Sequence, residues 1–147
     1  MINIEIIDRF AARIGPNTIL NAAQQTLLHQ KVSIDVDLSI LVEDGEKLKE
    51  LNQQFLNIDS ATDVLSFPAN EIDPETGRNY LGDIIISFPH AEKQAQDAGQ
   101  SSDREVQLLV VHGILHLLGY DHANNSEKKE MWAIQNDILA CLAGNNF

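Results

Sequence analysis

The chain has little of what a secreted or membrane-bound protein needs. Its single cysteine, Cys141, cannot form an internal disulfide, and Glu5 and Asp8 lie where a signal peptide would be apolar. No apolar run approaches the roughly eighteen residues of a membrane span. We therefore expect a cytoplasmic protein that does not enter the membrane.

Basic side chains are also scarce. The chain has 10 Lys and Arg residues against 22 Asp and Glu, which gives a formal net charge of −12. Broad binding to nucleic acid depends on clustered basic residues, so this balance argues against it. A local positive cleft is still compatible with the sequence, because a bound zinc ion is itself a large local charge.

The length and composition predict one globular domain. The 147 residues are 44% hydrophobic and 22% charged, and we expect residues 1–147 to form a single metal-dependent hydrolase domain. Alternating apolar residues predict strands, and apolar stripes with helical spacing predict helices. The strands fall at 2–6, 36–42, 62–68 and 81–87, and the helices at 17–30, 45–55, 89–98, 102–118 and 124–142.

This order of elements predicts an α+β fold. We expect a small mixed four-stranded sheet, its last two strands antiparallel, with helices covering one face and a metal site at the end of a central helix. The S-x-x-E pattern from Ser102 to Glu105 predicts a capping box at the start of that helix. Residues 69–80 hold Pro74 and Gly77 and predict an irregular solvated loop; a flap near the site is the alternative.

The stretch from His112 to His122 carries most of the chemical information. It reads HGILHLLGYDH, that is, H-x3-H-x5-H. Histidines four residues apart share one face of a helix, and Gly119 can end that helix and turn the chain back. Three imidazoles with one open position are typical of a catalytic zinc. We predict that His112, His116 and His122 bind one Zn²⁺ per chain.

The same frame occurs in the metzincin proteases, with one difference. Their pattern is H-E-x-x-H-x-x-G-x-x-H, and its glutamate is the general base. Gly113 takes that place here, so the sequence offers the metal ligands of a hydrolase without the protease's proton acceptor. A metallopeptidase-like hydrolase is therefore one alternative, and a non-catalytic factor with a structural zinc is another.

Three stretches together resemble the YbeY family. The stretch from His112 to His122 resembles the family signature H-G-x-L-H-L-x-G-Y-D-H at every fixed position, TDVLSFP at 62–68 is similar to its second motif, and LGDI at 81–84 is similar to its third. With the matching order of elements, the resemblance covers nearly the whole chain. Two departures stand out: Phe55-Leu56 replaces a frequent Tyr-Arg pair, and Ala61 replaces a frequent proline.

The resemblance implies an activity and partners. It implies a single-domain, zinc-dependent, single-strand-specific endoribonuclease of bacteria, acting in rRNA maturation, notably at the 3′ end of 16S rRNA, and in ribosome quality control. It also implies that the three motif histidines, here His112, His116 and His122, hold the metal. The expected partners are rRNA and the small ribosomal subunit, with neither a membrane nor a nucleotide cofactor.

The remaining site residues are hypotheses. A zinc-bound water would be the reactive group, and no side chain stands out as general base. Asp121 could orient a ligand imidazole, although a role in the turn is an equal alternative. Arg78 could replace the missing arginine as a phosphate contact. Asp83 could face either the cleft or the outer surface.

Overall fold

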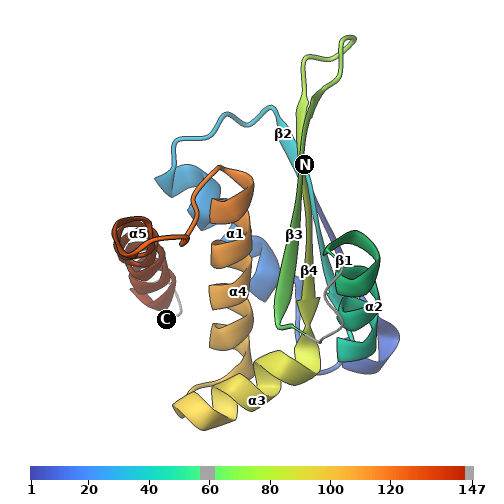
Figure 1. Cartoon of the computed structure of the whole chain (residues 1–147), viewed down its shortest axis with the longest axis vertical. Helices are drawn as coiled ribbons and strands as arrows, with labels where there is room; N and C mark the ends of the chain where they lie inside the picture. Colours follow the sequence, from blue (N-terminus) through green and yellow to red (C-terminus); the bar gives the residue numbers. More distant parts are fainter. Residues whose placement is uncertain (57–61, 145–147) are drawn as a thin grey trace.

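The computed structural model describes residues 1–56 and 62–144, so Ala61, one of the two departures noted above, lies outside the described residues. Its sheet has four strands in the order β1-β2-β4-β3 (Figure 1). The strands are β1 (Ile2–Ile6), β2 (Val36–Glu43), β3 (Val64–Ile72) and β4 (Asn79–Ser87). β1, β2 and β4 are parallel, whereas β3 pairs antiparallel with β4. The predicted mixed sheet is confirmed.

The loop predicted for residues 69–80 is mostly a hairpin, so this prediction was wrong. β3 continues past Pro68 to Ile72, β4 begins at Asn79, and pairing resumes after a bulge with Glu71 opposite Tyr80. Pro68 can lie within the strand because β3 is at the sheet edge, where a missing N–H costs no ladder bond. The bulge absorbs the irregularity that the sequence pattern suggested would end the strand.

Helices cover both faces of the sheet, which corrects the expectation of one covered face. In Figure 1, α1 (Pro16–His29), α4 (Ser102–Leu117) and α5 (Asn125–Gly144) lie on one side and α2 (Gly45–Leu56) on the other, while α3 (Phe88–Ala98) follows β4. Ile84 and Ile86 of β4 join the large core, whereas Ile85 joins a small cluster with Leu48 and Leu65. Because β4 is apolar on both faces, both need cover.

The central helix α4 is apolar nearly all round, as expected for a helix buried among other elements. It packs against α1, α3, α5, β3 and β4. Its N-cap is Ser101, whose hydroxyl accepts from the Arg104 backbone N–H, one residue before the predicted cap. Glu105 is buried and accepts a hydrogen bond from the Gln100 side chain, so it does not complete a capping box.

Within residues 1–56 and 62–144, none of the helices combines the length and the apolar character that a membrane span requires.

Candidate metal centre

Three imidazoles meet at the C-terminal half of α4. His112 and His116 lie one turn apart on that helix, with their Nε2 atoms 3.1 Å from each other. The chain then turns at Gly119, whose φ of 102° is disfavoured for residues with a Cβ, and brings His122 back to the pair. One ligand atom from each of the three rings lies within 4.8 Å of the others. The group could therefore hold one metal ion.

Neighbouring groups orient the nitrogens of the two helical histidines. His112 Nδ1–H donates to Oε1 of Gln135 on α5, at 3.0 Å. The His116 imidazole also hydrogen-bonds with the backbone of Tyr120. When the outer nitrogen of an imidazole carries the proton, the other nitrogen presents a lone pair. With both outer nitrogens protonated, the two Nε2 atoms would face each other as acceptors, which is the arrangement that a shared cation requires.

The spacing and protonation of this group fit zinc. Two nitrogens bound at roughly 2.0–2.1 Å in tetrahedral geometry lie about 3.3 Å apart, close to the observed Nε2 separation. Burial lowers the pKa of both His112 and His116, and the neighbouring histidines lower both values further. Neutral imidazoles are the form that binds a metal. The residues present therefore suit a single zinc-like cation.

Gly113 explains why the glutamate of the metzincin pattern is missing. A Cβ at this position would lie 2.9 Å from Cγ2 of Ile84 in β4. Position 113 therefore faces the sheet and not the histidine cluster, and the backbone carbonyl of Gly113 accepts a hydrogen bond from the Ser66 hydroxyl of β3. A glutamate here would enter the packed contact between helix and sheet. This position cannot supply a general base to the cluster.

The other predicted residues have different environments. Asp121 is exposed and accepts from the His122 backbone N–H at 2.7 Å, which is a turn contact. Its charge partly opposes the lowering of the His116 pKa by burial. Arg78 lies in the β3–β4 hairpin and pairs with Asp37 through Nη2 at 2.7 Å. Asp83 accepts from the Tyr80 hydroxyl and lines a groove on the α2 face, away from the cluster.

Two side chains of α5 belong to the site although the sequence did not single them out for it. Trp132 has its ring centroid 5.6 Å from those of both His112 and His122. Gln135 is buried against His112. The sequence does contain a signal that could have identified them. Positions 132 and 135 share one face of a helix, and a glutamine at a core-facing position needs a polar partner.

The two remaining histidines lie elsewhere. His90 is half-buried at the start of α3, and its Nδ1 lies 2.6 Å from the hydroxyl of Ser87, the N-cap of that helix. His29 is exposed at the end of α1. Neither belongs to the group of three histidines.

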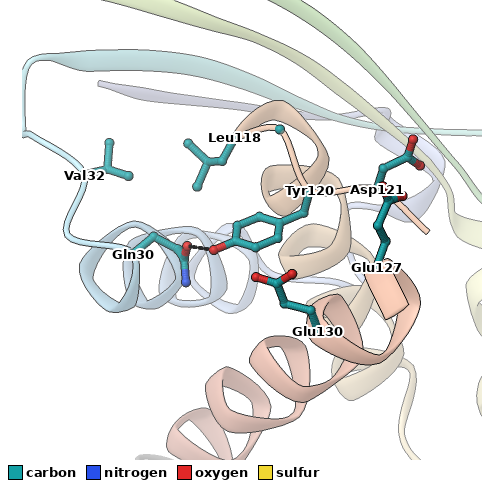
Figure 2. Close-up of a pocket in the computed structure, with 8 residues that line it drawn as sticks. Gln30, Val32, Leu118, Tyr120, Asp121, Glu127 and Glu130 are labelled. Atoms are coloured by element: carbon teal, nitrogen blue, oxygen red, sulfur yellow. Dashed lines mark hydrogen bonds between the residues drawn. The ribbon is translucent and has the colours of Figure 1, made fainter. Parts of the chain in front are cut away.

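An acidic hollow borders the turn after α4. It has a volume of about 530 Å³, and Asp121, Glu127 and Glu130 contribute carboxylates to its lining (Figure 2). Across it the Tyr120 hydroxyl donates to Oε1 of Gln30 at 2.8 Å, the dashed contact in Figure 2. Phosphate groups are repelled by this side of the site.

Comparisons with known proteins agree on one family. Residues 7–143 match the family model described as Endoribonuclease YbeY. Proteins named Endoribonuclease YbeY from Shouchella clausii and Roseiflexus castenholzii are 42% and 37% identical, covering 95% and 97% of this chain and 94% and 92% of their own lengths.

A solved structure supports the same fold. The solution structure of TM1509 from Thermotoga maritima is 32% identical to this chain, with a TM-score of 0.63, and the match covers 95% of this chain and 87% of the other. The similarity in sequence and in structure extends well beyond the eleven residues of the histidine stretch. This chain belongs to the endoribonuclease YbeY family.

Proposed function

We propose that this protein is a zinc-dependent, single-strand-specific endoribonuclease. It acts in the cytoplasm on rRNA of the small ribosomal subunit, in maturation of the 16S rRNA 3′ end and in ribosome quality control. The observation that carries the metal-dependent part is the group of three imidazoles with their ligand atoms within 4.8 Å of one another. Membership of a family named for endoribonuclease activity supports the reaction class.

Each residue of the cluster and its surroundings has a separate role in this proposal. His112, His116 and His122 would hold the zinc, and Gln135 keeps His112 in the tautomer whose Nε2 is free. Zinc at such a site supplies Lewis-acid chemistry, polarising a phosphoryl oxygen and activating water. Asp121 holds the backbone turn that carries His122. Trp132 packs against two of the three rings and limits their rotation.

The direct test is RNA cleavage by the purified protein. The substrate is small-subunit RNA with an unprocessed 3′ end, incubated with the zinc-loaded protein, with the chelated protein, and with the chelated protein after zinc is restored. We expect cleavage that chelation abolishes and zinc restores. Cleavage that persists at the same rate in the chelator would contradict the metal-dependent mechanism.

Histidine variants assign the activity to the site. His112→Ala and His116→Ala should lose zinc and RNA cleavage together, whereas His29→Ala, at the exposed end of α1, should retain both. Zinc content is measured by mass spectrometry and folding by circular dichroism. A folded, zinc-free and fully active His116→Ala protein would rule out the proposed mechanism.

The same preparations separate the alternatives. Peptide cleavage that depends on intact histidines would favour a metallopeptidase. A His116→Ala protein that unfolds, together with a wild type that cuts no RNA, would favour a structural zinc in a non-catalytic factor.

A further inference from the structure

We propose that a hollow at the start of α5 binds an unpaired base and an adjacent phosphate of single-stranded RNA, next to the histidine cluster. The hollow, called here the lysine–tryptophan hollow, has a volume of about 680 Å³ and is lined by Asn125, Ser126, Lys128, Lys129 and Trp132. This inference rests on the proposed function, because it names how the substrate of that site is held.

Trp132 contacts both the hollow and the histidine cluster. The indole lines the hollow and its ring also meets the His112 and His122 rings nearly at right angles, with centroids 5.6 Å away in each case. A base held against the indole would therefore be one side chain away from the cluster. A separation of one side chain suits a nucleotide that is next to the cleaved phosphate in the RNA.

The two lysines are the available cations of this region. Arg9, Arg13 and Arg78 form ion pairs with carboxylates. Among the described residues, no ion pair involves Lys128 or Lys129; the Lys128 ammonium lies 5.4 Å from the Trp132 ring centroid. Both lysines are exposed. Among the described residues, other basic side chains also lack an ion pair, but Lys128 and Lys129 are the ones that line this hollow together with Trp132.

A flat aromatic ring with flexible cations beside it suits single-stranded nucleic acid. Bases stack on aromatic side chains without regard to sequence, and basic side chains follow the phosphates. Lysine has a long flexible stem, so the Lys128 ammonium can move from the indole to a phosphate when a base takes its place.

The charges around the cluster determine the side from which RNA can approach it. The acidic hollow next to the turn after α4 carries Asp121, Glu127 and Glu130 (Figure 2), and the lysine–tryptophan hollow lies on residues of the same α5 start. A polyanion avoids the first and favours the second. The RNA therefore approaches the histidines from the side of Trp132.

Trp132 is the single tryptophan of the chain, so its fluorescence reports this hollow directly. The first experiment titrates chelated, uncleaving protein with a single-stranded RNA of about twelve nucleotides, and with a duplex of the same sequence, while tryptophan emission is recorded. We expect saturable quenching by the single strand and little by the duplex, whose bases are already stacked. Binding of the single strand without any change in emission would overturn the proposal.

A matched pair of double variants tests the lysines. Lys128→Ala/Lys129→Ala and Lys47→Ala/Lys49→Ala change the net charge equally, but the second pair lies on α2, on the other face of the sheet. We expect the first variant to bind labelled RNA about tenfold more weakly at low salt, with a salt slope smaller by about 0.7, the contribution of one phosphate contact on a single strand. Equal weakening in both variants would show that only net charge matters and would overturn the proposal.

Two variants at Trp132 separate stacking from packing. Trp132→Phe keeps an aromatic face and should retain most of the RNA affinity, whereas Trp132→Leu should lose about tenfold, within the range known for stacking on one aromatic residue. Anisotropy of labelled RNA is the readout, and zinc content of both variants is the control for the histidines. Equal affinity of the two variants would exclude stacking.

These experiments distinguish failure of the proposed hollow from failure of the proposed RNA-cleaving activity. If the wild type cleaves RNA in a zinc-dependent manner but neither lysines nor Trp132 affect binding, the hollow is wrong and the activity stands. If the single strand quenches Trp132 and the variants weaken binding but no RNA is ever cut, the hollow stands and the activity is wrong.

Discussion

Two polar clusters of this protein differ in the partners that their side chains have. At the base of the β3–β4 hairpin, Arg78 donates from Nε and Nη2 to Asp37, and Nη2 also lies near the backbone carbonyls of Ile34 and Val36. In the histidine cluster, three groups of the same kind face one another, and the nearest Nε2 atoms are 3.1 Å apart. The first cluster pairs opposite charges, whereas the second brings together three imidazole rings whose ligand nitrogens lie within 4.8 Å of one another.

The difference separates a cluster whose charges are paired from one that could hold a metal ion. Matched partners cancel each other's field and leave little to bind a ligand. Imidazoles grouped in this way do not pair opposite charges, and Gln135 and Trp132 of α5 hold the His112 ring in its place. The comparison yields four predictions.

The largest effect is expected at Gln135. Gln135→Leu removes the acceptor that holds His112 Nδ1–H, and loss of such a partner typically costs about 10–100-fold in metal affinity. Competition for zinc with a fluorescent chelator measures it. Gln107→Leu is the control, because this buried glutamine bonds to the Thr18 carbonyl away from the cluster and should leave zinc affinity unchanged. Equal zinc affinity in both variants would remove Gln135 from the site.

Gly113→Ala should destabilise the packing of α4 against the sheet. The new Cβ would lie 2.9 Å from Cγ2 of Ile84, and overpacking of this kind costs about 1–3 kcal/mol of unfolding free energy. Urea denaturation measures the cost. Gly144→Ala in α5 meets no atom within 4 Å and should not destabilise the protein. An unchanged urea midpoint for Gly113→Ala would mean that α4 and β4 can move apart to accommodate the new Cβ at little cost in free energy.

Arg78→Ala should lower stability slightly and leave RNA cleavage unchanged. Its ion pair with Asp37 is partly exposed, and such pairs contribute about 0–1 kcal/mol. The thermal midpoint and the cleavage rate are measured side by side. If cleavage instead falls by about tenfold in a folded variant, Arg78 contacts the substrate, as the sequence had allowed.

The smallest effect is a pH dependence at Asp37. The Arg78 guanidinium, and next the chain's amino terminus, hold the pKa of this carboxyl below its usual value of 3.8. A depressed pKa adds stability that is present above the unfolded-state value and lost as the pH falls toward the folded-state value. Asp37→Asn should therefore melt slightly below the wild type at neutral pH, and the gap should close below about pH 4. If the difference in melting temperature between the two proteins widened in acid, the pKa of Asp37 would be shifted in the opposite direction.

Much of the fold was predictable because its signals are local. The alternation around Val36, Leu38 and Ile40 marks a strand in any context, and the strands and helices expected from such patterns are present with shifts of a few residues. The hairpin between Pro68 and Tyr80 was missed because its pairing depends on a bulge and on an edge position. Neither feature has a periodic signature in the sequence.

The site divides in the same way. The spacing of His112 and His116 on one helix, and the turn at Gly119, are properties of consecutive residues, so the sequence alone determined that these imidazoles could meet a third at His122. Only the tertiary structure decided that Gln135 would accept from His112, that position 113 would face Ile84, and that Arg78 would pair with Asp37. Those contacts join residues more than twenty positions apart, and their formation depends on how helices and strands pack, which no local pattern encodes.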